Sequence, residues 1–162
     1  MTESAEERTR RKFLAHFDQH EWQYQITVFL RSPDDIEDAA ELFAKARKHF
    51  ARKNPNHPIL WRTGVKGVIP HQVFPTYKTK ERIINMPFLT LITTKEFDHT
   101  KAVAQFDGLS VVGRLDIRQR VFAESKRTSY RKAVQKQKSH DLKAVFGDRK
   151  INRFGMLNSN HI

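Results

Sequence analysis

The sequence predicts an α+β fold: a mainly antiparallel sheet with helices packed on one face, followed by a basic C-terminal helical arm. Three observations indicate it: an alternating run at 22–30, an amphipathic helical pattern directly after it, and an Asp-Gly pair typical of a hairpin turn. With 162 residues and 38% hydrophobic side chains, the chain is long enough for one packed core. We expect an α/β core over 1–113 and the basic helical segment over 114–162.

The first two predicted elements are a helix and a strand. The helix is expected over Ala5–His16, where phenylalanine and leucine side chains form one apolar patch. Over Trp22–Leu30, apolar residues alternate with glutamine and threonine, as in a strand that is buried on one face. Phe29 interrupts the polar face of this strand, so we expect that face to be partly covered.

The next element is a helix over 34–53. Ser32 occupies the N-cap position, Pro33 the first helical position, and acidic residues the first turn. Acidic side chains precede basic ones along this segment, which complements the helix dipole at both ends. The sequence Asn54-Pro55 then ends the helix.

The remaining elements are less regular. Strands are predicted over Ile59–Val65 and Phe88–Thr93, and a hairpin over Lys101–Phe106 and Leu109–Leu115. From Asp116 to Phe146 the chain contains neither glycine nor proline and few apolar residues. This composition predicts one long polar helix or a pair of helices.

Charge is the most informative property of the composition. The formal net charge is +12. Residues 1–113 hold 17 basic and 14 acidic groups, whereas residues 114–162 hold 13 and 4, so the excess lies in the last third. This imbalance favours a polyanionic partner, first of all nucleic acid, either DNA or RNA. An acidic lipid surface or an acidic protein is the alternative.

Other classes of protein are excluded by missing features. Without cysteine there is no thiolate zinc site and no cysteine nucleophile. No apolar run is long enough for a signal peptide or a membrane span, so we expect a cytoplasmic protein with no membrane partner. No nucleotide-binding motif is present, and no cofactor is expected.

The predicted nucleic-acid contacts lie in the basic C-terminal segment. Arg127 with Arg131, and Lys132 with Lys136, stand one helical turn apart, where like charges repel and a phosphate backbone would relieve the repulsion. Tyr77 and Tyr130 are expected to be exposed, with Tyr77 available for stacking on bases. The full set of predicted contacts is Arg118, Arg120, Lys126, Arg127, Arg131, Lys132, Lys136, Lys138 and Tyr77.

One segment resembles a known family. The order of strand 22–30, charged helix 34–53, strand 59–65 and then Pro70-His71-Gln72 resembles the N-terminal layout of the HUH endonucleases. These are rolling-circle replication initiators, relaxases and small transposases. The resemblance implies an antiparallel sheet with helices on one face, and metal-assisted cleavage of single-stranded DNA by a tyrosine that stays linked to the 5′ phosphate.

The resemblance also implies a set of catalytic residues. His71 would be a ligand of the divalent metal, and a tyrosine would be the nucleophile. Tyr130 suits this role better than Tyr77, because a helix can present its hydroxyl across the sheet, whereas Tyr77 follows His71 by only six residues. Three hypotheses remain: a non-enzymatic replication, packaging or regulatory accessory factor that binds nucleic acid, an active nuclease that requires a divalent metal, and an inactive relative of such a nuclease.

Overall fold

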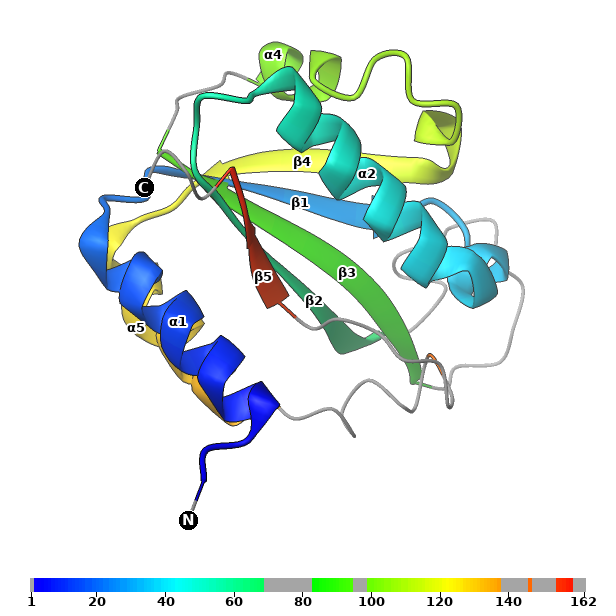
Figure 1. Cartoon of the computed structure of the whole chain (residues 1–162). Coiled ribbons are helices and arrows are strands. Elements are labelled where there is room, and N and C mark those ends of the chain that lie inside the picture. The colour runs from blue at the N-terminus through cyan, green and yellow to red at the C-terminus, as the bar shows by residue number, and fades with distance from the viewer. Residues whose placement is uncertain (1, 69–82, 95–98, 138–145, 147–153, 159–162) are drawn as a thin grey trace.

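The computed structural model contains a five-stranded antiparallel sheet and helices, which confirms the predicted α+β class. It describes residues 2–68, 83–94, 99–137, 146 and 154–158. The elements, shown in Figure 1, are α1 (Ala5–Gln19), β1 (Tyr24–Leu30), the 3-10 helix η1 (Pro33–Asp38), α2 (Ala39–Lys53), β2 (Ile59–Val68), β3 (Ile84–Thr93), α4 (His99–Ala104), the 3-10 helix η2 (Val112–Arg114), β4 (Leu115–Val121), α5 (Glu124–Lys136) and β5 (Phe154–Leu157).

The strands lie in the order β4-β1-β3-β2-β5, and every neighbouring pair is antiparallel. Without α1, α5 and β5, the chain follows the path β-α-β-β-α-β with the sheet order 4-1-3-2. This is the arrangement of the ferredoxin-like folds. Because many functions occur on that arrangement, the topology by itself identifies none of them.

One face of the sheet is covered by α2 and α4 (Figure 1). The side chains of this larger core come from alternate positions of the strands, as expected for a pleated sheet. Its main members are Ile26, Val28, Ile59, Trp61, Leu89 and Leu91 from the sheet, with Leu42, Phe43, Ala46 and Phe50 from α2.

The opposite face is covered at one end only. Leu60 and Ile92 alternate with the residues of the larger core, so they point to this second face. There they belong to a smaller core with side chains of α1 and α5, which lie side by side in Figure 1. The remainder of this face has no helix over it among the described residues. The helices are thus distributed over both faces of the sheet.

The predicted start of the helical region is confirmed with one difference. The backbone N–H of Asp34 donates to Ser32 Oγ at 3.2 Å, as an N-cap requires. The first six residues after this cap form the 3-10 helix η1, and α2 begins only at Ala39. None of the side chains of η1 is fully buried, whereas those of Ala39, Leu42 and Phe43 are.

The predicted hairpin around Asp107-Gly108 is wrong. Residues 101–104 belong to α4, where Ala102 is fully buried, and Phe106 follows it at helical spacing on the same core. Gly108 does adopt the positive φ of 87° that the Asp-Gly pair predicts. The turn therefore exists, but it lies between α4 and η2 rather than between two strands.

The predicted helix over 116–146 is wrong for its first six residues. These belong to β4, which pairs with β1 from Tyr24↔Val121 to Leu30↔Leu115. The alternation of Leu115 and Ile117 with charged side chains is a strand pattern that the high charge obscured. The expected boundary at Gly113 therefore lies just before an edge strand of the same sheet, and β4 and α5 are parts of the core rather than of a separate arm.

Candidate nucleic-acid interface

The uncovered end of the second sheet face forms a shallow groove of about 590 Å³. We call this region the open face. Its floor consists of residues from the two central strands, and its rims come from β2 and β4. The residues lining it are Gln25, Thr27, Phe29, Leu30, Arg31, Lys66, Val68, Met86, Phe88, Thr90, Asp116, Arg118 and Arg120. Four of these side chains are basic and one is acidic, so the groove favours an anionic ligand.

Two phenylalanine side chains stand next to each other on the open face. Phe29 of β1 pairs directly with Phe88 of β3, and both are partly exposed. The Phe88 ring lies over Gly64 of β2, where an added Cβ would be 2.4 Å from Phe88 Cζ. The Phe29 ring is directed away from Gly64, toward β4, where the Arg118 guanidinium lies 5.5 Å from the centroid of the ring. Both positions thus combine an accessible ring with a neighbouring cation.

Arg62 of β2 lies at the boundary between the open face and the covered end. Its guanidinium is 5.4 Å from the centroid of the Phe88 ring, and its Nε donates to Gln137 Oε1 at 2.7 Å. Burial lowers the pKa of Arg62, although arginine stays charged at neutral pH. No acidic side chain in the described part of the chain forms an ion pair with it. A desolvated cation of this kind is stabilised by an anion nearby.

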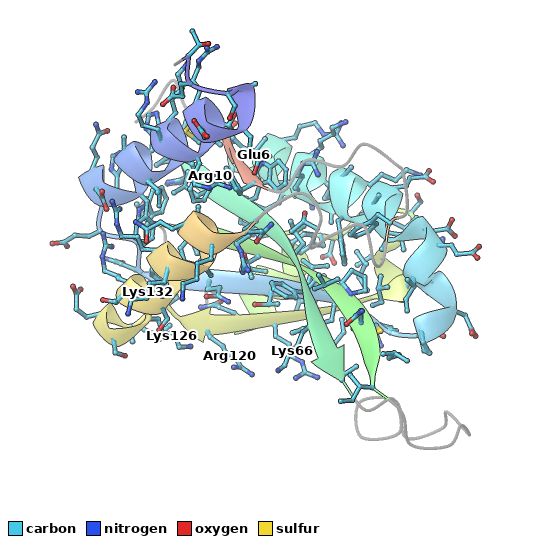
Figure 2. The ribbon with its side chains drawn as sticks, turned by 90° about the horizontal axis from the view of Figure 1, so that it is seen from below. Glu6, Arg10, Lys66, Arg120, Lys126 and Lys132 are labelled. Carbon is cyan, nitrogen blue, oxygen red and sulfur yellow. The ribbon has the colours of Figure 1, made fainter. Side chains whose placement is uncertain are left out.

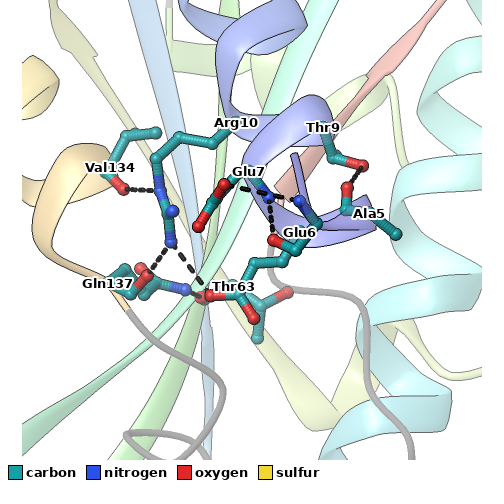
Figure 3. Close-up of polar contacts among 9 residues, drawn as sticks. Ala5, Glu6, Glu7, Thr9, Arg10, Thr63, Val134 and Gln137 are labelled. Atoms are coloured by element: carbon teal, nitrogen blue, oxygen red, sulfur yellow. Dashed lines mark hydrogen bonds and ion pairs between the residues drawn. The ribbon is translucent and has the colours of Figure 1, made fainter. Parts of the chain in front are cut away.

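Gln137 fixes the end of α5 to the sheet, as Figure 3 shows. The buried Gln137 side chain donates from Nε2 to the Thr63 carbonyl at 2.8 Å. Arg10 of α1 donates from Nε to the Val134 carbonyl at 3.1 Å and from Nη2 to the Gln137 carbonyl at 2.6 Å. These bonds satisfy carbonyls that a helix leaves free at its C-terminus. The last turn of α5 is therefore held by both α1 and β2.

Two of the predicted nucleic-acid contacts serve the fold. Arg127 donates to the carbonyls of Phe17 and His20 at 3.2 and 3.3 Å, and its guanidinium lies 4.7 Å from the Phe17 ring centroid. Arg131 donates from Nη1 to both carboxylate oxygens of Asp18 at 2.6 Å. The repulsion expected between these arginines is thus relieved by α1, without any phosphate.

Other predicted contacts are available to a ligand. Arg120 is exposed at the end of β4, and Lys126, Lys132 and Lys136 are exposed on α5. None of these four side chains forms a hydrogen bond or an ion pair with another described residue. Arg118 is exposed too, but it pairs with Asp116 at 3.0 Å. Lys138 lies outside the described residues.

Four cations follow one another along the side of the molecule that faces away from α2. Figure 2 shows Lys132 and Lys126 of α5, then Arg120 of β4, and then Lys66 of β2. Arg120 and Lys66 also line the groove of the open face, so this series begins beside the groove and continues onto α5. We call Lys66, Arg120, Lys126 and Lys132 the basic row.

The candidate nucleophile Tyr130 lies on a helix, α5, as the sequence predicts, but its side chain is not exposed. Its side chain is buried in the smaller core, where its ring contacts Phe13, Phe17 and Phe122. Burial raises the pKa of the Tyr130 phenol, and the nearby Arg62 and Thr90 lower it only in part. The prediction that Tyr130 is exposed is therefore wrong, because three aromatic neighbours enclose it, and a buried phenol with a raised pKa is a poor nucleophile.

His71 and Tyr77 both lie outside the described residues, so their roles as metal ligand, nucleophile or stacking residue stay predictions. Within the described ranges, no group of three or more side chains is arranged to hold a metal ion.

Sequence reasoning missed Phe29, Phe88, Arg62 and Lys66 as site residues. The interruption of the polar face by Phe29 is the one signal in the sequence, and that signal predicts a cover over the face rather than a binding surface. The pairing of Phe29 with Phe88 depends on the order of the strands, which the sequence alone does not specify.

Comparison with protein-family models, with curated proteins and with solved structures found no match for this chain. In the described part of the chain, no helix is both long enough and apolar enough to cross a membrane.

Proposed function

We propose that this protein binds nucleic acid through the open face and the adjoining basic row. The observation that carries the proposal is the basic row itself: four exposed cations on three different elements, which have no acidic partner among the described residues and lie on one side of the molecule. Cations placed in this way are free to neutralise successive phosphates and to release their counterions.

The site differs from a basic helical arm. On α5 the basic row contains only Lys126 and Lys132, whereas Arg127 and Arg131 already bond to residues of α1. The edge strand β4 and the far end of β2 supply the other cations. A rigid sheet presents these charges at fixed separations, so the protein loses less conformational freedom on binding than a mobile arm would.

The test compares two double variants that remove the same charge. Lys126→Gln with Lys132→Gln removes two members of the basic row, and Lys48→Gln with Arg52→Gln removes two exposed cations of α2 on the opposite side. Binding is measured by fluorescence anisotropy with a labelled oligonucleotide over a range of salt concentrations. The first variant should bind more weakly, and its salt slope should shrink by roughly 0.7–0.9 for each lost phosphate contact.

The control variant should lose little affinity, because it changes the net charge by the same amount without touching the row. Equal losses in the two folded variants would contradict the assignment of the site. Absence of salt-dependent binding to DNA and RNA, or equally tight binding to vesicles of anionic lipid, would contradict nucleic acid as the partner.

A further inference from the structure

Building on this proposed function, we infer that the open face takes up unpaired bases on Phe29 and Phe88, so that the ligand is single-stranded. Electrostatic attraction alone does not distinguish a duplex from a single strand. The two rings distinguish a single strand from a duplex, because an aromatic side chain can stack on a base only when that base is not stacked inside a duplex.

The position of the rings supports this inference. Phe29 and Phe88 come from the two central strands and are direct partners across the β1–β3 ladder. Directly paired side chains lie about 4.5–5.5 Å apart at Cβ, and here the rings are directed to opposite sides, toward Arg118 and Gly64. Two successive bases of an extended nucleic-acid strand can therefore stack on this pair of rings, one base on each ring.

The surroundings of the rings support it as well. Arg118 lies beside the Phe29 ring, and Arg62 lies beside the Phe88 ring. Gln25, Thr27 and Thr90 line the floor of the groove, and of these the partly exposed Gln25 side chain can bond to the edge of a base. From there the basic row continues along one side of the molecule, where it can follow the phosphates of the same strand.

A large apolar side chain on a sheet surface is usually covered by a helix. Leu60 and Ile92, on the same face, are covered in this way by α1 and α5. Phe29 and Phe88 remain partly exposed although they lie on the same sheet face. In contrast to the core residues, they are placed where no described helix shields them from a ligand.

The experiment uses the variants Phe29→Leu and Phe88→Leu, which keep an apolar side chain at each position. Tyr24→Leu is the matched control, because Tyr24 lies on β1 as well but does not line the groove. Affinities for a labelled single strand and for its duplex are measured by anisotropy. Each stacked base contributes roughly 1–3 kcal/mol, so loss of a ring should weaken single-strand binding by roughly 5- to 150-fold.

The pattern of losses separates this inference from the proposed function. We expect weaker single-strand binding in both phenylalanine variants, an unchanged salt slope, and no change in the control or in duplex binding. If the wild type binds single strand and duplex equally and the phenylalanine variants match it, base stacking is excluded while salt-dependent binding stands. If the wild type binds neither ligand at any salt concentration, the proposed function itself fails.

Discussion

At the scale of single residues, Gly64 is the position where one methyl group has the largest consequence for the site. Its Cβ would meet three atoms of the Phe88 ring at 2.4–3.0 Å, so Gly64→Ala must displace that ring from the sheet. We expect the variant to lose single-strand affinity to about the same extent as Phe88→Leu, with an unchanged salt slope. Anisotropy titrations at several salt concentrations measure both quantities.

Gly113→Ala is the control for this substitution, because an added Cβ there meets no atom within 4 Å. It should leave both affinity and melting temperature unchanged. Full single-strand affinity in a folded Gly64→Ala variant would show that the position of the Phe88 ring is unimportant for binding.

A second prediction at this scale concerns Tyr130 and the dependence of the protein's stability on pH. Burial raises the pKa of its phenol in the folded protein, whereas in the unfolded chain the phenol ionises near its ordinary pKa of about 10. The neutral, buried phenol therefore contributes its full stabilisation to the folded protein below about pH 10. This contribution is lost as the pH rises further, because the phenol of the unfolded chain ionises first. We expect the stability of the wild type to fall more steeply above pH 10 than that of Tyr130→Phe.

Denaturation with urea at successive pH values measures this difference, and absorbance near 295 nm follows phenolate formation. The Tyr130 phenolate should appear only together with unfolding. A phenolate of Tyr130 that forms near pH 10 in the folded protein would show that its side chain is accessible, and would restore it as a candidate nucleophile.

At the scale of elements, α5 is a docked helix whose last turn depends on Arg10. The guanidinium donates to the carbonyls of Val134 and Gln137 and also pairs with Glu6 at 3.1 Å (Figure 3). Arg10→Gln should therefore destabilise the protein by roughly 1–3 kcal/mol, since it leaves partly buried carbonyls without their donor. Lys132→Gln, on the exposed side of the same helix, should change stability by less than about 0.5 kcal/mol.

Urea denaturation gives both free energies of unfolding. Hydrogen exchange adds a local measurement, because the amides of the last turn of α5 should lose protection in Arg10→Gln before the sheet does. Equal stability of the two variants would mean that α5 does not depend on its hydrogen bonds from Arg10.

The sequence predicted the elements best where one pattern dominates. The helix predicted over Ala5–His16, the strand predicted over Trp22–Leu30 and the cap at Ser32 follow from spacing and local hydrogen bonding. The structure confirms them as α1, β1 and the cap of η1, with ends that differ by two or three residues. The failures occur where two patterns overlap. Leu115 and Ile117 alternate with charged residues in β4, but the density of arginine and lysine there was interpreted as a solvent-exposed helix.

The site was less predictable than the elements. Net charge indicated an anionic ligand, but it did not distinguish Arg127 and Arg131, which bond to α1, from Lys126 and Lys132, which are exposed. That distinction depends on contacts between residues about a hundred positions apart. The pairing of Phe29 with Phe88 likewise depends on which strands become neighbours, and local sequence patterns do not determine this.

At the scale of the whole molecule, the described elements of the basic C-terminal third, β4, α5 and β5, pack with the rest of the chain. β4 pairs with the full length of β1, and Phe122, Tyr130, Val134 and Phe154 belong to the smaller core. A fragment of residues 1–113 loses all these contacts and exposes the edge of a central strand. We expect it to lack a cooperative thermal transition, as measured by circular dichroism, whereas the full chain has one. A fragment that melts cooperatively would confirm the boundary at Gly113 that the charge distribution predicts.

Because β4 and α5 pack with the rest of the chain, stability and binding depend on some of the same contacts. The open face is bordered by β4 on one side and by β2 on the other, and Arg62 joins it to the end of α5 through Gln137. Variants that loosen α5 should therefore weaken binding as well as folding, whereas loss of a member of the basic row should weaken binding alone. Urea denaturation of each binding variant therefore separates a loss of binding from a loss of folding.

The measurement that tests the central claim most directly is a titration of the isotope-labelled protein with a short single-stranded oligonucleotide, followed by NMR. The account predicts that amide signals of the open face and the basic row change first, including those of Thr27, Phe29, Phe88, Thr90, Arg118, Arg120 and Lys126. Signals of α2, including those of Lys48 and Arg52, should stay unchanged. Changes that cluster on α2, or no changes at low salt with either DNA or RNA, would contradict the claim that the open face binds nucleic acid.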